Sequence, residues 1–363
     1  MSEEFGPAGW LTSAPVERVV RVGGVGADIV GFDGQAIQRA VDALGPAGGS
    51  VDLDAGVFDI AAPIRLSDDV RLRGRGAATV LRKIDGVHAP AVIDADYGEL
   101  VVTLADTAGF AVGMAVQVSD DDAVNWGCST SVVSAVTAQQ VFLRDRLLRD
   151  YRADRQCVIA NSGSVIAAVD ARRVRIERLT IAGNKATNTF LNGCRGGGVY
   201  LYRCGQCLIQ DVQVADFNGD GISWQITEDI TLRDCEVSGC ANYGLHPGTG
   251  STRTQVTGCA VHHNGGDGLY VCWRVQQGRF WANRIHDNGG AGVSLGHKDT
   301  DNVFEDNQIF RNAGPGVLFR PESPANGAHR NHFRANRIVD NAGSALVPAI
   351  QLDPSAEDVV IEA

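Results

Sequence analysis

Apolar residues alternate with polar residues in short segments that recur along the second half of the chain. A glycine opens each segment, and successive glycines are 23 or 24 residues apart: Gly198, Gly221, Gly244, Gly268, Gly292 and Gly316. An apolar residue follows each glycine, and another comes two positions later. Because side chains alternate between the two faces of a strand, this period of two predicts strands with one buried face. Short strands in a repeat without helices predict a β-solenoid whose coils stack about 4.8 Å apart.

Asparagines occupy fixed positions in the repeat. The larger set precedes the glycines and consists of Asn218, Asn242, Asn264, Asn288 and Asn312. A second set contains Asn283 and Asn307, and we expect each amide to bond to its copy one coil away. Cys235 and Cys259 precede Asn283 at 24-residue steps, so these two thiols are predicted to have a structural packing role.

The first part of the chain predicts a cap for the solenoid. Within residues 35–44, apolar residues recur at three and four positions, which indicates one amphipathic helix: Ala36, Ile37, Ala40, Val41 and Leu44. Such a helix would cover the open end of the first coil, where the core and the strand edges are otherwise exposed. We predict four parts: residues 1–98 as cap and first coils, 99–161 as an inserted β-rich lobe, 162–352 as β-helix repeats and 353–363 as a C-terminal tail.

Composition narrows the class of protein. With 44 Gly, 44% apolar and 21% charged residues in 363, the chain is not disordered, collagen-like or a coiled coil. The net charge of −11 repels DNA, RNA and anionic membrane, so no nucleic acid or membrane partner is expected. No apolar run approaches the roughly 18 residues of a membrane span.

Cysteine content and the first residues suggest a compartment. The nine cysteines cannot all pair within the chain, and we expect reduced thiols. The acidic first residues lack the features of a secretory signal. A cytoplasmic location is therefore predicted for the chain as given, or secretion if a leader was removed.

Short motifs near the start resemble a known family. Gly26-Ala27-Asp28, Asp33-Gly34, Gly48-Gly49-Ser50-Val51 and Gly74-Arg75-Gly76 are similar to the opening of pectate-lyase-like proteins. The resemblance implies an all-β fold, a right-handed parallel β-helix with an N-terminal helical cap. That superfamily includes lyases, epimerases, hydrolases, transferases and phage adhesins, so the resemblance implies the fold more than the activity.

One repeat resembles a catalytic strand. Tyr243-Gly244-Leu245-His246-Pro247-Gly248 is similar to the Tyr-Gly-Phe-Asp-Pro-His-Glu strand of mannuronan C-5 epimerases. His246 stands where that motif has its catalytic Asp, and Gly248 stands where it has its catalytic His. Tyr243 is retained, but the catalytic motif as a whole is not.

The outward strand positions form a candidate groove. The second residues after the repeat glycines are predicted to stack in one outward column: Tyr200, Ser223, His246, Tyr270, Ser294 and Leu318. The fourth residues point the same way: Tyr202, Gln225, Gly248, Cys272, Gly296 and Arg320. A row of hydroxyl, imidazole and amide groups suits a saccharide chain. The segments just beyond the strands add polar and aromatic residues to one edge: Trp273, Arg274, His297, Lys298, Asp299 and Glu322.

The chemistry predicted for this groove is proton transfer on a uronate-containing poly- or oligosaccharide, by a lyase or an epimerase. His246 and Tyr270 are one coil apart, so one could take a proton while the other returns one. Arg274, His297 and Lys298 are expected to support them, because cations stabilise the enolate-like charge that forms beside a carboxylate. The substrate-binding candidates are Tyr200, Tyr202, Ser223, Gln225, Tyr243, Trp273, Asp299, Arg320 and Glu322.

Three other functions fit the same sequence. A glycoside hydrolase would need two carboxylates, and the candidates are Asp220, Glu228, Asp229, Asp299, Asp301 and Glu322. An intracellular isomerase or cyclase could bind a small metabolite in the groove. A non-catalytic glycan-binding module would use Tyr200, Tyr202 and Trp273 as stacking platforms. No cofactor is expected, calcium at Asp120-Asp121-Asp122 is an alternative, and a homo-oligomer such as a trimer fits this class.

Overall fold

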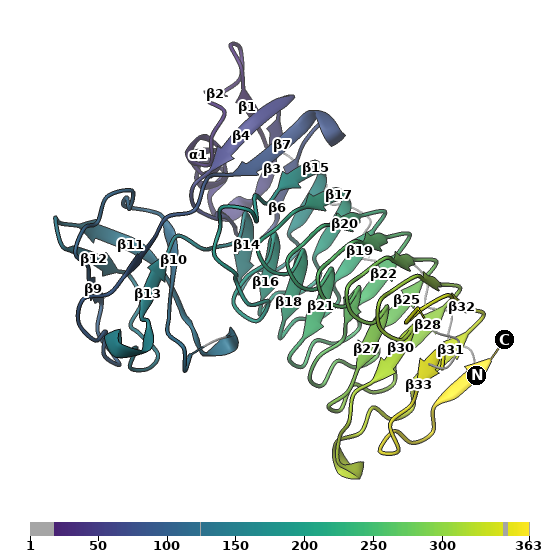
Figure 1. Cartoon of the computed structure of the whole chain (residues 1–363). Coiled ribbons are helices and arrows are strands. Elements are labelled where there is room, and N and C mark those ends of the chain that lie inside the picture. The colour runs from purple at the N-terminus through teal and green to yellow at the C-terminus, as the bar shows by residue number, and fades with distance from the viewer. Residues whose placement is uncertain (1–17, 124, 344–347, 363) are drawn as a thin grey trace.

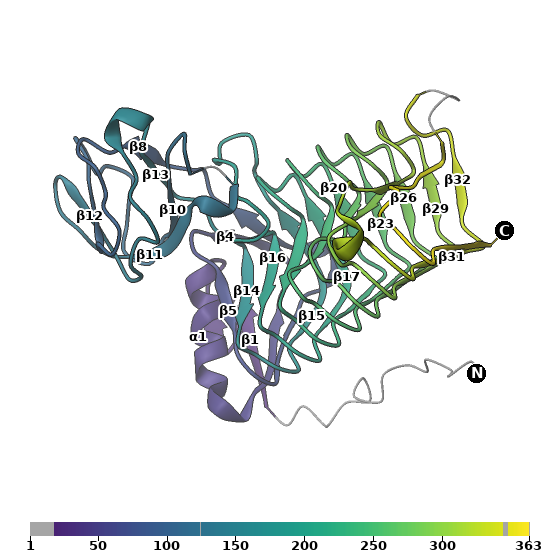
Figure 2. The ribbon, with the colours of Figure 1, turned by 90° about the horizontal axis from the view of Figure 1, so that it is seen from below.

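Three faces of parallel strands wind around one long hydrophobic core (Figures 1 and 2). The computed structural model of the chain describes residues 18–123, 125–343 and 348–362. A nine-stranded sheet forms the face that carries the predicted groove. Its strands are β5 (Ile64–Leu66), β14 (Ile166–Val169), β16 (Val199–Tyr202), β18 (Ile222–Gln225), β21 (Leu245–Gly248), β24 (Leu269–Tyr270), β27 (Val293–Leu295), β30 (Val317–Phe319) and β33 (Ile350–Gln351).

The other two faces belong to a 19-stranded sheet. One face contains β1 (Val19–Gly23), β2 (Ile29–Val30), β3 (Gly49–Leu53), β6 (Val70–Arg73), β19 (Thr231–Arg233), β22 (Gln255–Thr257), β25 (Arg279–Trp281), β28 (Val303–Glu305), β31 (His332–Arg334) and β34 (Val360–Glu362). The other contains β4 (Gly56–Ile60), β7 (Thr79–Lys83), β20 (Glu236–Ser238), β23 (Ala260–His262), β26 (Arg284–His286), β29 (Gln308–Phe310) and β32 (Arg337–Val339). The longer strands β15 (Arg175–Ala182) and β17 (Leu208–Ala215) pair with both faces.

The predicted period of two is confirmed in these strands. Ile222 pairs with Leu245, and Leu245 pairs with Leu269, so equivalent residues of successive coils are neighbours. All three side chains are buried, whereas the next residue on each strand points out of the core. The fold thus follows directly from the alternation in the sequence.

The predicted asparagine bonds between coils are confirmed for the later coils but not for Asn218 and Asn242. These two donate to Ser162 and Asp220 instead, because they stand at other distances from their repeat glycines. The Nδ2 group of Asn264 donates to Oδ1 of Asn288 at 2.9 Å, and Asn288 bonds to Asn312 at 2.9 Å. In the second set, Asn283 donates to Oδ1 of Asn307 at 3.0 Å. The backbone N–H of Cys259 donates to Asn283, which extends this ladder by one thiol position. Cys235 and Cys259 are both buried, as their predicted packing role requires.

The predicted helical cap is α1 (Gly34–Leu44). Asp33 begins it by accepting a hydrogen bond from the backbone N–H of Ala36 at 2.7 Å. All five apolar residues of the predicted face are buried against the first coil. The single-turn helices are η2 (Gly45–Ala47), η3 (Gly76–Ala78), η4 (Asn125–Gly127), η5 (Ala153–Arg155) and η6 (Pro324–Asn326).

The inserted lobe is a six-stranded antiparallel sheet beside β14 (Figure 1). Its strands, in spatial order, are β8 (His88–Pro90), β13 (Val158–Ala160), β10 (Ala115–Ser119), β11 (Ser129–Val136), β12 (Gln140–Leu143) and β9 (Val101–Thr103). It begins before the predicted boundary at residue 99, because His88 pairs with Ala160 and adds β8 to the sheet. A separate hydrophobic core stabilises it.

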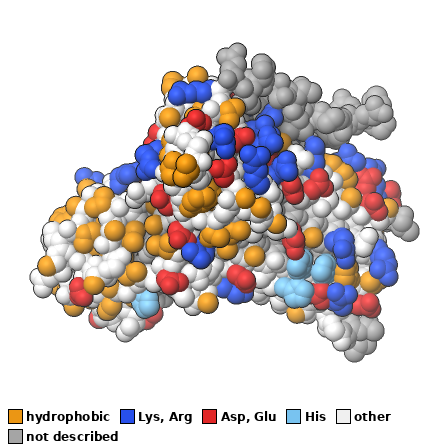
Figure 3. All heavy atoms as spheres, turned by 90° about the horizontal axis from the view of Figure 1, so that it is seen from above, with side chains coloured by type: hydrophobic (Ala, Val, Ile, Leu, Met, Phe, Trp, Pro, Cys, Tyr) orange, Lys and Arg blue, Asp and Glu red, His pale blue; other side chains and the backbone are white. Residues whose placement is uncertain are grey.

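The predicted C-terminal tail is part of the β-helix and continues its stack of coils. Val360 pairs with His332, so β34 adds a strand to the last coil instead of forming a separate segment. On the face shown in Figure 3, basic and acidic side chains lie beside one another. Ion pairs such as Arg173–Asp69 join neighbouring coils of the β-helix. Within the described ranges, no helix has the length and apolar character needed to cross a membrane.

Candidate functional site

His246 on β21 and Tyr270 on β24 lie side by side in the outward column. Ser223 is the register partner of His246, and Tyr270 is the register partner of Ser294. The rings of His246 and Tyr270 meet edge to face, with centroids 5.1 Å apart. The structure therefore brings together the two residues that the sequence selected as proton donor and acceptor.

A loop covers part of the predicted groove. The segment Asn192–Gly196 lies over β16, β18 and β21, where Ser223 donates a hydrogen bond to the carbonyl of Gly193 at 2.6 Å. Ser223, Gln225 and His246 are therefore buried, with at most 3% of each exposed. This corrects the prediction that Ser223 and Gln225 bind substrate in the groove. The cause is a tertiary contact, since strand alternation alone directs both side chains outward.

The loop packs closely over Asp220 and His246 because the residue at the contact is a glycine, Gly193. A Cβ atom added to Gly193 would lie 1.6 Å from Oδ2 of Asp220 and 2.6 Å from Nδ1 of His246. The lobe steadies the same loop, because the Arg195 guanidinium donates to the carbonyl of Trp126 at 2.8 Å. Tyr200 also anchors it by donating to the carbonyl of Cys194 at 2.9 Å.

Asp220 and His246 form a fully buried pair beneath this loop. Nδ1 of His246 lies 2.7 Å from Oδ2 of Asp220. The other oxygen of Asp220 accepts from the side chain of Asn242 at 2.8 Å and the backbone of Tyr243 at 3.2 Å. Nε2 of His246 has no hydrogen-bond partner and is buried. The pair thus fixes the ring through one nitrogen and leaves the other nitrogen for chemistry.

The pKa of His246 is raised to about 9. Burial opposes its positive charge, but the hydrogen bond to Asp220, an interaction with Cys272 and the charge of Asp220 outweigh that effect. At neutral pH the imidazole therefore carries a proton. A proton acceptor for the saccharide must be sought beside His246 rather than in its own ring.

Tyr270 lies between this pair and a cation. The Arg320 guanidinium lies 4.4 Å from the centroid of the Tyr270 ring, and the Tyr243 ring stacks on its other side at 3.9 Å. Arg320 is held by hydrogen bonds to Ser294 at 2.7 Å and to the carbonyl of Val271 at 2.6 Å. Burial raises the pKa of Tyr270, which keeps its hydroxyl protonated at neutral pH.

The turns beyond the strands form an outer edge of the site. The exposed Trp273 stacks on His297 with centroids 4.5 Å apart, and His297 pairs with Glu322 at 3.1 Å. Arg274 and Lys298 are exposed residues of these turns and lie outside the column of His246 and Tyr270. Tyr200 and Tyr202 stack on each other at 6.2 Å near the covered end. Most predicted binding residues thus fall into an inner cluster and an outer edge.

Asp299 differs from its predicted role in substrate binding. Its side chain is fully buried and accepts hydrogen bonds from the backbone of Val275 at 3.0 Å and Gly296 at 2.8 Å. Burial raises its pKa to about 6, although the nearby Arg320 acts in the opposite direction. Asp299 therefore holds the turn and Arg320 in place instead of facing a saccharide.

The other carboxylates proposed for hydrolysis are also engaged. Glu228 and Asp229 pair with Arg253, and Asp301 pairs with Arg330. All of these pairs lie in turns between coils. The hydrolase alternative consequently lacks a pair of unengaged carboxylates among these candidates.

The candidate calcium ligands support the lobe. Asp120 accepts hydrogen bonds from the backbone N–H groups of Asp122 at 3.1 Å and Arg152 at 3.0 Å. Asp122 forms an ion pair with Arg155 at 2.7 Å. In the part of the chain that the structure describes, no group of three or more His, Cys, Asp or Glu side chains is arranged to hold a metal ion.

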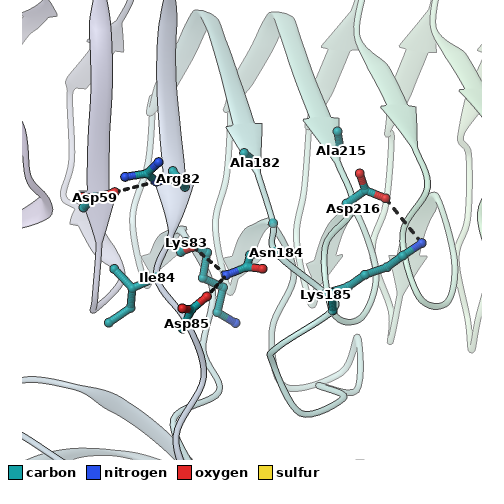
Figure 4. Close-up of a pocket in the computed structure, with 12 residues that line it drawn as sticks. Asp59, Arg82, Lys83, Ile84, Asp85, Ala182, Asn184, Lys185, Ala215 and Asp216 are labelled. Carbon is teal, nitrogen blue, oxygen red and sulfur yellow. Dashed lines mark hydrogen bonds and ion pairs between the residues drawn. The ribbon is translucent and has the colours of Figure 1, made fainter. Parts of the chain in front are cut away.

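A second hollow lies at the turns after β7, β15 and β17 (Figure 4). Its charges are paired, with Arg82 on Asp59 at 2.8 Å and Lys185 near Asp216 at 3.4 Å. Lys83 is buried there and donates to Asn218 at 2.7 Å, and burial lowers its pKa to about 7. This hollow shares no residue with the cluster around His246.

Three features of the site were not predicted from sequence as parts of one cluster. Asp220 precedes a repeat glycine, a position that holds Tyr243, Asp267 and Ala291 in later coils. Cys272 occupies a fourth position in the outward column, and its difference from glycine at positions 248 and 296 was the available signal. Nothing in the repeat pattern indicates that Gly193 covers Asp220.

Comparison with known proteins supports the fold. Residues 197–349 match a family described as "Right handed beta helix region", and no curated protein matches the chain. ORF18 of Geobacillus virus E2 is 14% identical with a TM-score of 0.51, and the match covers 88% of this chain and 52% of that one. The chain thus spans about half the length of the viral protein.

Two other solved structures are similar at lower scores. The mannuronan C-5 epimerase AlgE6 A-module of Azotobacter vinelandii is 16% identical with a TM-score of 0.42, covering 91% of this chain and 95% of that one. The periplasmic alginate epimerase AlgG is 15% identical with a TM-score of 0.45, covering 85% and 63%. At these identities the similarity concerns the fold alone. The chain is a right-handed parallel β-helix protein.

Proposed function

We propose that this β-helix protein is a carbohydrate-active enzyme that transfers a proton on a uronate-containing saccharide, as a lyase or an epimerase. The observation that carries the proposal is the placement of Tyr270. Its half-buried ring lies between the Arg320 guanidinium and the Asp220–His246 pair. A phenol whose ring is flanked by a guanidinium and an imidazolium is suited to give up a proton and to regain it.

In this mechanism a base beside His246 takes the hydrogen at C5, next to the uronate carboxylate, as a proton. The electron pair left behind moves into the carboxylate, where positive charge in the site stabilises it. In elimination, Tyr270 gives its proton to the leaving oxygen at C4. In epimerisation, it gives its own proton to C5 on the opposite face, and the proton held by the base later restores the Tyr270 hydroxyl. His246 is too deeply covered to touch the saccharide, so it acts as a positioning residue that keeps a positive charge next to Tyr270.

The covered end sets a direction for the substrate. Ser223 and Gln225 lie beneath the loop, so subsites on the β16 and β18 side of Tyr270 are closed. Trp273 remains exposed on the other side and offers an aromatic platform for a sugar ring. We therefore expect action near one end of a saccharide chain or on a short oligosaccharide.

The test is incubation with a panel of polyuronates and their oligosaccharides, with calcium and with a chelator. Ultraviolet absorbance of an unsaturated product, together with its mass, indicates elimination. Deuterium uptake at C5 from heavy water without cleavage indicates epimerisation. Tyr270→Phe should abolish either signal, and Trp273→Ala should raise KM more than it lowers kcat.

Other outcomes would contradict the proposal. Saturated fragments would favour the hydrolase alternative, and binding without chemistry would favour a glycan-binding module. Turnover confined to small metabolites would favour the isomerase or cyclase alternative.

A further inference from the structure

Two of the nine cysteines are partly exposed. Cys194 belongs to the covering loop, and Cys272 follows Tyr270 by two residues on the same outward side. The other seven thiols are buried in the coils or in the lobe. Cys272 is therefore one of two thiols that a molecule in the groove can reach.

Cys272 is placed diagonally to His246. It forms a parallel bridge with Gly248, which lies two residues after His246 on the neighbouring coil. Side chains in such a diagonal relation are within reach when one of them is long. Cys272 contributes to the raised pKa of both His246 and Tyr270, as expected for a thiol beside the two rings.

One ring nitrogen of His246 lacks a hydrogen-bond partner. Asp220 occupies Nδ1, so Nε2 is the ring atom that remains for the thiol. A buried ring nitrogen without a partner costs free energy, so such groups are rare in native structures and often mark a catalytic role. An aspartate, a histidine oriented by it and a neighbouring thiol are the groups that together activate a nucleophile.

We propose that Cys272 is a reactive thiolate maintained by Asp220 and His246, and that it is the group that accepts the C5 proton of the uronate. In the resting site the S–H bond breaks, the electron pair stays on sulfur and the proton moves to Nε2. During turnover an S–H bond forms as the C5–H bond breaks, and the C5 electron pair moves into the carboxylate. The thiolate itself does not depend on the proposed function, whereas its role as C5 base does.

The charged and titratable groups around the Cys272 thiol affect how its reactivity depends on pH. The charged or titratable groups that face it or its imidazole partner are Asp220, Tyr243, Tyr270, Cys194 and Arg320. Arg320 reaches past Gly296 to the carbonyl of Val271, the residue before Cys272, so its positive charge lies near the thiol. Asp220 and Cys272 both act to raise the pKa of His246, so the thiol has an imidazolium as its neighbour at neutral pH.

The first experiment is alkylation of the folded protein with iodoacetamide, followed by peptide mass spectrometry. Cys194 is the internal control, since burial raises its pKa to about 12. A free thiol has about 1% thiolate near pH 6.5, so a permanent thiolate should react at least about tenfold faster, allowing for its lower nucleophilicity. We expect Cys272 to react at least about tenfold faster than Cys194, with a rate nearly constant between about pH 6 and 8.

Substitutions in the Asp220–His246 pair test whether His246 causes the reactivity of Cys272. His246→Asn and Asp220→Asn should each slow alkylation of Cys272 at least about tenfold and make its rate rise with pH like a simple thiol. Circular dichroism and the unchanged rate of Cys194 serve as folding controls, and either variant suffices if the other does not fold. Equal rates at Cys272 and Cys194 in the unaltered protein would overturn the thiolate.

Activity on the polyuronate found above tests the role as C5 base. Cys272→Ser keeps the shape but not the acidity of the thiol, so kcat should fall at least about 100-fold with little change in KM. Tyr270→Phe should lose activity while Cys272 stays reactive. Full activity of Cys272→Ser would overturn the base role. Fast alkylation without action on any polyuronate would overturn the proposed function and leave the thiolate supported.

Discussion

The asparagine ladder and the groove column run along the same coils, yet they satisfy their polar groups in opposite ways. In the ladder, Asn288 accepts from Asn264 and donates to Asn312, so identical residues complete one another's hydrogen bonds. In the column, His246 and Tyr270 are unlike neighbours, and Nε2 of His246 is left without a partner. Identical residues at a repeat position thus indicate structure, whereas unlike residues with an unused polar atom indicate chemistry.

The largest expected effect is the loss of activity caused by Tyr270→Phe in the groove column. The change removes one hydroxyl from the column while the stacking on Tyr243 remains. We expect activity on a uronate substrate to fall about 10²–10⁴-fold, because a group that transfers a proton is lost. The measurement is kcat with the substrate identified above, and the thermal unfolding midpoint is the control. An active variant would show that the column is structural at this position.

The pH dependence of stability should distinguish the His246 pair from ordinary surface charge. The pKa of His246 is about 9 in the folded protein against 6.5 when unfolded, so its contribution is complete below about pH 6.5 and is lost as pH rises to about 9. A difference of that size corresponds to about 3 kcal/mol. Urea unfolding of the unaltered protein and His246→Asn across this range measures the difference between them.

Lys83 should make stability depend on pH in the opposite direction to His246, and this provides a control. Burial lowers its pKa to about 7, so the stability of the folded state should rise as pH increases above 7. This contribution is common to the unaltered protein and His246→Asn, and it cancels in their difference. A pH-independent difference would contradict the assigned protonation of His246.

Asn288→Ala tests the ladder side of the comparison. The substitution removes an amide that bonds to Asn264, Asn312 and the carbonyl of Val261. We expect the free energy of unfolding to fall by about 2–3 kcal/mol, because buried polar groups lose their partners. Gln308→Ala, at an exposed position of β29, is the matched control and should change stability little.

Gly193→Ala should have a smaller effect on stability, localised at the cover. The added Cβ would clash with Asp220 and His246, so the loop must move. We expect a loss of about 1–2 kcal/mol in chemical unfolding and faster alkylation of Cys194 as its loop opens. Gly24→Ala is the control, since an added Cβ there meets nothing within 4 Å. Unchanged reactivity of Cys194 would show that the loop does not depend on this close approach.

The sequence predicts the coils well because the same contacts recur in every coil. Spacing of glycines and alternation of apolar residues determine register, and the five apolar positions of α1 are enough to identify its buried face. The asparagine ladders follow from the same period. The start of the lobe was missed, because β8 is a short segment that becomes a strand only by pairing with β13.

The site was less accessible to sequence reasoning, because its key contacts join parts of the chain that no period relates. Adjacent placement of His246 and Tyr270 follows from the repeat. The bond from Asp220 to His246 does not, and neither does the burial of Ser223 beneath Gly193. Strand alternation gives the direction of a side chain but not what covers it, so the loop over part of the predicted groove could not be foreseen.

The pairing of His88 with Ala160 means that the chain enters and leaves the lobe at neighbouring points. Ile64 and Ile166 are register partners, so the coils on either side stack as though the lobe were absent. A single genetic insertion into an existing turn could therefore have added this unit without disturbing the stack. Excision of the lobe should therefore keep the register of the coils, while the covering loop would lose the bond from Arg195 to Trp126.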